Sequence, residues 1–172
     1  MMAQRSGSID PGLLVYLLTR QGVDAAMLDR VLNAESGLFG VSGVSADLRE
    51  VQAAADAGQE HAILAIEMFV HRIVGCIGSM LAHLGGVDTL VFTGGIGEHS
   101  GRVRMQVCAA FDFLGLRLDA DANQRSGGDS DISRADSSIR VLVIAAREDI
   151  SILRQTQRLL GWDHPLPTLL PR

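Results

Sequence analysis

The sequence has few aromatic residues and no cluster of basic residues. Aromatic side chains make up 4% of the 172 residues, so a hydrophobic core must be built from Leu, Val, Ile and Ala, which the hydrophobic share of 47% can supply. The formal net charge is −5 and no run of basic residues occurs. Because binding of nucleic-acid phosphates needs a basic surface, this charge pattern excludes a nucleic-acid partner from our expectations.

An apolar signal sequence and an uninterrupted membrane span are also lacking. The segment Met1–Gly7 has no apolar core. The longest apolar region, 62–84, is interrupted by charged and histidine side chains, whereas a span needs about 20 mostly uncharged residues. We therefore predict a long buried helix here, in a cytoplasmic protein without membrane contact. The only cysteines, Cys76 and Cys108, are predicted to be free buried thiols in a reducing compartment; a disulfide or redox role is the alternative.

Apolar periodicity and turn residues predict one helix-rich α/β domain. Strands are expected at Thr89–Phe92 and 139–144, and a sheet this small suggests further strands that the pattern does not reveal or that the chain does not carry. The segments 36–45 and 123–138 are predicted to be loops, and 162–172 to be irregular. Helices are expected from Pro11 to Gly22 and over 24–33, 47–57, 59–84, 103–114 and 150–160.

The segment Val91–Ser100 is the most informative part of the chain. A short strand meets Gly94, Gly95 and Gly97, whose missing side chains would let a ligand approach the backbone, and a helix N-terminus would follow with free N–H groups. This pattern favours a nucleotide site. It is neither a P-loop, since no Lys-Ser or Lys-Thr pair follows Gly97, nor a complete dinucleotide fingerprint, since Ser100 replaces the third glycine. The alternative is a tight turn without a ligand.

Three further groups of charged residues could carry chemistry. Glu148 and Asp149 follow the second strand, where α/β sheets gather ligands, and a carboxylate there could hold Mg²⁺ through water. The alternative is acidic capping of the last helix. Arg5 could equally be a solvated charge, and Asp47-Leu48-Arg49 could be charge patterning at a helix start.

Five segments, taken in order, resemble the C-terminal part of acetate kinases, the acetokinase family. Together they cover nearly the whole chain. They are Arg5-Ser6-Gly7-Ser8-Ile9-Asp10-Pro11, Glu35-Ser36-Gly37-Leu38-Phe39-Gly40, Ser45-Ala46-Asp47-Leu48-Arg49, Phe92-Thr93-Gly94-Gly95-Ile96-Gly97-Glu98-His99 and Ala146-Arg147-Glu148-Asp149.

The resemblance implies a ribonuclease-H-like, actin-like kinase fold with two lobes and ATP between them. Residues 1–172 would be the C-terminal nucleotide-binding lobe, with the N-terminal lobe absent. Arg5 would be the catalytic arginine and Glu148 would help to place Mg²⁺; Asp47, Leu48 and Arg49 would lie near the adenosine. The residues that would line the nucleotide site are Gly95, Ile96, Gly97, Glu98 and His99.

The reaction implied is the transfer of a phosphoryl group from ATP to acetate, giving ADP and acetyl phosphate. Alternatives are a nucleotide-binding module without catalysis and a remnant that keeps only a dimerisation surface. A homodimer and a separately encoded N-terminal half are the expected protein partners, and the chain is expected to begin at an internal methionine of a longer ancestor or to be a split gene product. His99 and Arg147 each replace an asparagine of the family pattern, and Arg147 places a positive charge beside Glu148.

Overall fold

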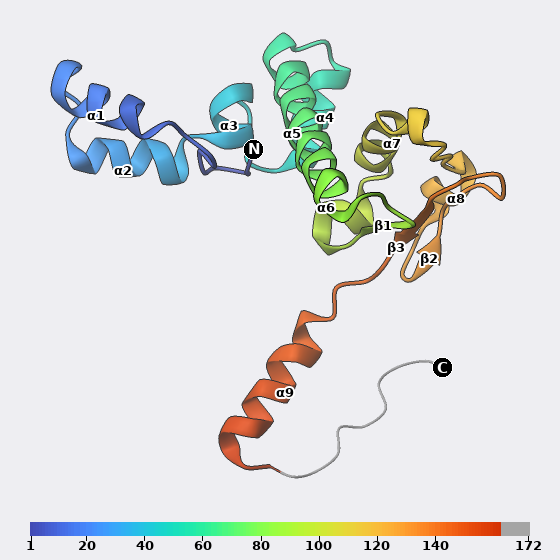
Figure 1. Ribbon diagram of the computed structural model, residues 1–172. Helices are drawn as coiled ribbons and strands as arrows, with labels where there is room; N and C mark the ends of the chain where they lie inside the picture. The colour runs from blue at the N-terminus through green and yellow to red at the C-terminus, as the bar shows by residue number, and fades with distance from the viewer. Residues whose placement is uncertain (163–172) are drawn as a thin grey trace.

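The computed structural model describes residues 1–162 and has an α/β architecture rich in helices (Figure 1). The predicted irregular tail lies outside the described residues except for Trp162. The elements are α1 Pro11–Arg20, α2 Ala25–Ala34, α3 Gly37–Ser42, α4 Leu48–Asp56, α5 Glu60–Leu84, β1 Thr89–Phe92, α6 Gly94–His99, α7 Gly101–Ala109, the 3-10 helix η1 Asp112–Leu114, α8 Ala120–Arg125, β2 Ser130–Asp131, β3 Arg140–Val143 and α9 Glu148–Leu160.

The described strands form a three-stranded sheet in the order β1-β3-β2. β1 and β3 are parallel, with Thr89 opposite Arg140 and Phe92 opposite Val143. β2 pairs with β3 in the antiparallel sense. Because β1 and β3 run in the same direction, the segments that follow them leave from the same edge of the sheet. This topology brings the glycine-rich segment and the residues around Glu148 to one place.

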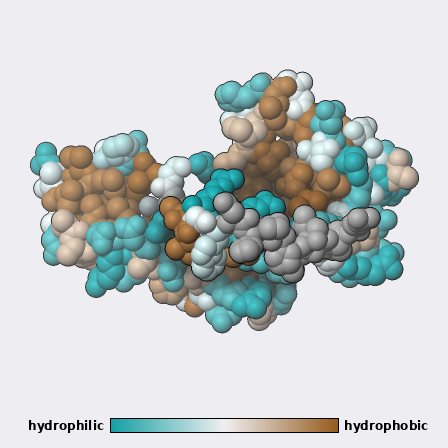
Figure 2. All heavy atoms as spheres, turned by 90° about the horizontal axis from the view of Figure 1, so that it is seen from below, coloured by the Kyte–Doolittle hydropathy of each residue, from teal (hydrophilic) through white to brown (hydrophobic). Residues whose placement is uncertain are grey.

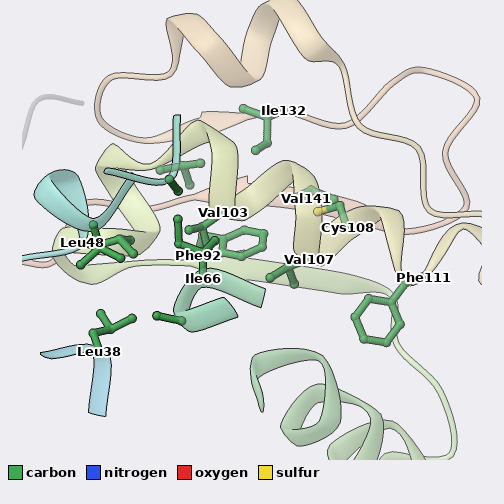
Figure 3. Close-up of a cluster of buried hydrophobic side chains, with 14 of the residues drawn as sticks. Leu38, Leu48, Ile66, Phe92, Val103, Val107, Cys108, Phe111, Ile132 and Val141 are labelled. Carbon is green, nitrogen blue, oxygen red and sulfur yellow. The ribbon is translucent and has the colours of Figure 1, made fainter. Parts of the chain in front are cut away.

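The core lies between the first half of α5 and the helices α3, α4 and α7, and it continues onto the sheet. Figure 3 shows Ile66 of α5, Phe92 of β1 and Val103 of α7 pointing toward one another. Ala62 and Ala65 are fully buried on α5, because their small side chains let neighbouring helices approach closely. The other buried hydrophobic residues of this core are Leu38, Leu48, Val51, Ala55, Val107, Cys108, Phe111, Leu116, Ile132, Ile139, Val141 and Val143.

The prediction that α5 is buried along its length is wrong for its second half. Among the described residues α5 alone is long and apolar enough to span a bilayer by length and composition. Its start is buried in the core, but further along Phe69 and Ile73 are only partly buried, and Cys76 and Met80 are exposed. The reason is that the described residues cover the second half of α5 from one side only.

Three predicted boundaries also change. The predicted loop 36–45 contains α3, which ends at Gly43 in the left-handed region (φ 67°). The serines and glycines of this segment hid a short helix. The predicted loop 123–138 contains the end of α8 and the strand β2, and the predicted helix 103–114 stops at Ala109 and continues as η1. All three differences concern elements of two to six residues or helix ends, where tertiary contacts outweigh local propensity.

Two helical arms extend away from the core, one formed by α1 and α2 and the other by α9 (Figure 1). Within the described part of the chain, α1 and α9 have no buried residue. Figure 2 shows hydrophobic side chains gathered on the arm of α1 and α2. The large exposed hydrophobic residues of α1 and α9 are Leu13, Val15, Tyr16, Leu18, Ile152, Leu153, Leu159 and Leu160.

Candidate functional site

The glycine-rich turn joins β1 to α6 and presents bare backbone. Gly94 has φ +73°, a conformation that favours glycine. A Cβ atom built on Gly94 or Gly95 would meet no atom of the described residues within 4 Å, whereas one on Gly97 would contact Phe92 at 3.4 Å. The glycines therefore belong to the first turns of α6 rather than to a loop before it, and the backbone at Gly94 and Gly95 faces open space. Ile96 and His99 are exposed beside it.

The carboxylate of Glu98 connects this turn to the segment after β3. Its Oε1 atom accepts a hydrogen bond from the backbone N–H of Gly94 at 2.9 Å and another from Ala146 at 2.8 Å. The expectation of entirely free N–H groups at this turn is therefore wrong for Gly94. Residues 98 and 146 are far apart in sequence, and only the parallel pairing of β1 and β3 brings them together.

A buried arginine supports the other side of the turn. Arg104 of α7 is 2% exposed, and burial lowers the pKa of its guanidinium. It donates hydrogen bonds to the carbonyl oxygens of Gly97 and Glu98 and to both the backbone and the side chain of Asn123. Asn123 is itself 1% exposed. Neither residue could be recognised from the sequence, because a lone arginine or asparagine in a polar segment gives no local signal of burial.

Glu148 begins α9 at the same edge of the sheet and is exposed. The guanidinium of its neighbour Arg147 donates to Asp129 Oδ2 at 2.9 Å, and Asp129 Oδ1 accepts from the backbone N–H of Ala145. These hydrogen bonds, led by the one from Arg147, lower the pKa of Asp129. The charge of Arg147 is thus balanced by Asp129. In residues 1–162 no three His, Cys, Asp or Glu side chains converge to form a metal site, so Glu148 would hold Mg²⁺ only together with water and phosphate oxygens.

Asp47, Leu48 and Arg49 lie at the start of α4. Asp47 is the N-cap, and its carboxylate accepts a hydrogen bond from the backbone N–H of Arg49. The exposed guanidinium of Arg49 forms an ion pair with the same carboxylate. The hydrogen bond from the guanidinium, followed by the one from the backbone, lowers the pKa of Asp47 to about 2. Charge patterning at a helix start accounts for this pair, and its place near the adenosine stays a prediction. The side chain of Leu48 is buried in the core. One hydrogen bond, from Gln52 Nε2 to Ser100 Oγ at 3.3 Å, links α4 to the end of α6.

Arg5 belongs to the N-terminal segment. Its segment runs along α3, where Met2 and Gln4 accept backbone hydrogen bonds from Leu38 and Ser36. Arg5 is exposed, and no hydrogen bond or ion pair within residues 1–162 joins it to the glycine-rich turn. A groove of about 1000 Å³ lies beside this segment and includes Ser8, whose hydroxyl accepts from Arg72. The described residues thus bring the turn, Glu98 and the start of α9 together, and no described hydrogen bond or ion pair joins Arg5 to them.

An open glycine turn at the carboxyl edge of parallel strands, with an exposed carboxylate beside it, is typical of α/β proteins that bind nucleotides. Residues 1–154 match the model of the acetokinase family, and the chain belongs to this family. The predicted family is therefore confirmed. Its assignment to the C-terminal part of such a protein, and the roles of the individual site residues, stay predictions.

Relatives and solved structures agree with this family. The chain is 56% identical over 152 residues to an acetate kinase of Acaryochloris marina, covering 88% of this chain and 38% of the relative. It is 51% identical over 160 residues to an acetate kinase of a Cyanothece strain, covering 93% and 39%. The crystal structure of Porphyromonas gingivalis acetate kinase matches with a TM-score of 0.83 and 41% identity, covering 93% of this chain and 40% of that chain.

A propionate kinase from Francisella tularensis matches with a TM-score of 0.82 and 35% identity, covering 91% of this chain and 40% of that chain. The chain thus spans about two fifths of the length of the relatives that it matches. The fold is therefore that of acetate kinase structures over this portion, a helix-rich α/β arrangement with a small sheet.

Proposed function

We propose that this chain is the nucleotide-binding part of an acetate kinase, and that it corresponds to the C-terminal lobe of that enzyme in an actin-like kinase fold. The reaction is ATP plus acetate giving ADP plus acetyl phosphate. The observation that carries the proposal is the open backbone at Gly94 and Gly95. The carboxylate of Glu98 accepts hydrogen bonds from Gly94 and from Ala146, and so connects this backbone to the segment that leads into α9. The family match supports the acetate kinase part of the proposal. The cytoplasm, which holds ATP, is the compartment that we propose for it.

The residue types suit phosphoryl transfer to a carboxylate. Acetate is ionised at neutral pH, so no general base is needed and catalysis consists of positioning and charge stabilisation. Glycine backbone can lie close to phosphate oxygens, and the exposed carboxylate of Glu148 is a ligand type that suits Mg²⁺. Bound Mg²⁺ would neutralise phosphate charge. Arg5 would add positive charge at the transferred group.

We propose that a second protein surface completes this site. Arg5 and the glycine turn are both exposed and are not joined within the described residues. We propose that the acyl pocket lies in the part of the relatives' length that this chain does not span, on the same or a separate polypeptide. The uncovered apolar faces of α1 and α9 support contact with that part or with a second copy of the chain. The acceptor would be a short carboxylate.

Calorimetric titration of the full chain with MgADP tests nucleotide binding. Gly95→Leu is the informative variant, because its side chain would enter open space from a backbone with ordinary φ and should block the ligand without disturbing the fold. Gly75→Leu is the matched control, since Gly75 is also helical and open but lies on α5. We expect binding by the parent chain and the control and none by Gly95→Leu. Absence of binding by the parent chain, or unchanged binding by Gly95→Leu, would contradict the proposal.

A separate assay tests catalysis. The chain is mixed with the complementary portion of the Acaryochloris marina relative, and acetyl phosphate is trapped with hydroxylamine. We expect product only in the mixture, with ATP, Mg²⁺ and acetate all present, and a strong loss with Arg5→Gln. No product from two folded portions would favour nucleotide binding without catalysis.

A further inference from the structure

Arg104 is buried without an acidic partner. A guanidinium that is 2% exposed costs several kcal/mol to bury unless its charge is compensated. None of the ion pairs among the described residues includes Arg104. Its hydrogen bonds go instead to neutral oxygens: Gly97 O at 2.8 Å, Glu98 O at 2.7 Å, Asn123 Oδ1 at 2.8 Å and Asn123 O at 2.7 Å. The compensation therefore comes from carbonyl dipoles, two of which belong to α6.

α6 needs such support because its own sequence does not favour a helix. It has six residues, of which Gly94, Gly95 and Gly97 are glycine. Each glycine costs about 1 kcal/mol relative to alanine in a helix, and helices this short are unstable alone. Gly94 and Gly95 also have no side chain to pack. The shape of the turn must then depend on hydrogen bonds from outside the helix.

Those hydrogen bonds act on its two ends. The Glu98 carboxylate holds the first N–H group, at Gly94, and Arg104 Nη1 bridges the carbonyls of Gly97 and Glu98 at the other end. Asn123 holds the guanidinium in place and is itself fixed by donating to Gly101 O at 2.8 Å. A lysine could not replace this arrangement, because its ammonium is a single point donor while the guanidinium donates in several fixed directions.

We propose that Arg104 is a positioning residue for nucleotide binding: oriented by Asn123, it holds the carbonyls of Gly97 and Glu98 and so fixes the glycine turn on which the nucleotide rests. This inference rests on the proposed function. Arg104 does not touch the ligand and acts through the backbone of α6. The glycines leave room for a ligand beside the backbone but make the turn flexible. The hydrogen bonds from the buried Arg104 restrict the motion of that backbone.

The test compares Arg104→Lys with Val107→Ala. Val107 is fully buried on the same helix, and its truncation destabilises the core without removing a hydrogen bond from the turn. Both variants are titrated with MgADP at a temperature where urea unfolding shows them folded. We expect the Kd of Arg104→Lys to rise at least about tenfold, the effect of losing one charge-assisted hydrogen bond, and that of Val107→Ala to stay within about twofold. Hydrogen exchange should be about tenfold faster in Arg104→Lys alone at the two hydrogen-bonded amides of the turn, Gly94, which donates to Glu98, and Ser100, which donates to Ile96 O.

Unchanged affinity and exchange in Arg104→Lys, or an equal loss in Val107→Ala, would overturn the inference, since the arginine would then act through stability only. If the parent chain does not bind MgADP, the proposed function fails, and the exchange comparison alone decides whether Arg104 holds the turn. Should Arg104→Lys not fold, Asn123→Ser removes one of the four acceptors and is expected to raise Kd about threefold; no change there would equally count against the inference.

Discussion

Replacing Gly37 by alanine should separate two reasons for having glycine in the motif Glu35–Gly40. Gly37 has φ +65°, and a Cβ atom there would lie 2.9 Å from the carbonyl carbon of Met2 and closer still to its oxygen. Gly43, at the other end of α3, has nearly the same conformation, φ +67°, but no described atom lies within 4 Å of its Cβ position. The pair therefore has the same backbone strain and differs in the clash.

The expected magnitudes follow from this geometry. An L-residue in the left-handed region costs about 1 kcal/mol, and this is the whole loss expected for Gly43→Ala. Gly37→Ala must also push away the N-terminal segment, which accepts backbone hydrogen bonds from Leu38 at 2.8 Å and Ser36 at 2.8 Å. Overpacking of this kind costs about 1–3 kcal/mol, so we expect Gly37→Ala to lower the free energy of unfolding by about 3 kcal/mol.

Urea unfolding followed by circular dichroism measures both variants. Equal losses for the two variants, within about 0.5 kcal/mol, would refute the close approach of Met2 to Gly37. The comparison also bears on function, because the displaced segment carries Arg5. In the mixed assay for acetyl phosphate we expect Gly37→Ala to lose activity and Gly43→Ala to keep it at a temperature where both are folded.

Three further predictions concern titration, thiol reactivity and packing. The hydrogen bond from Arg147 lowers the pKa of Asp129, so the pair should be intact above the unfolded pKa of about 3.9 and should be lost as the pH falls through the lower pKa of the folded state. The NMR shift of the Ala145 amide, which donates to Asp129, should follow this titration. A titration midpoint at or above about 3.9 would contradict the prediction. Burial raises the pKa of the Cys108 thiol to about 12, so a thiol reagent at pH 8 should modify only the exposed Cys76 before unfolding; two fast equivalents would disprove this. Ala62→Leu should destabilise the chain by about 1–3 kcal/mol, and an unchanged urea midpoint would contradict the tight packing of α5 there.

Most of the local structure could be predicted from the sequence. The helix starts expected at residues 11, 24 and 47 agree with α1, α2 and α4 to within one residue. In the structure Asp10, Asp24 and Asp47 each accept a backbone N–H at these starts. The strands expected at 89–92 and 139–144, from short apolar runs bounded by turn residues, are found at 89–92 and 140–143. The two-residue strand β2 could not be predicted, because its position depends on pairing with β3 and not on its own polar residues.

The candidate site was predicted less completely. The glycine turn and Glu148 could be found because their residue types carry the signal, but the role of Glu98 in joining two segments depends on a register that no local pattern contains. The burial of individual side chains was more difficult to predict than the site. Cys76 and Cys108 both lie in apolar stretches, yet one is exposed and the other buried, since burial is decided by what packs on each face of a helix.

The sequence by itself determined the family, the glycine-rich turn and the helix starts, because these depend on residue identities a few positions apart. Only the tertiary structure decided which groups support the turn. The parallel pairing of β1 and β3 places Ala146 within reach of Glu98, and the packing of α7 against α8 buries Arg104 beside Asn123. Contacts between residues far apart in sequence depend on chain topology, and local propensity contains no record of it.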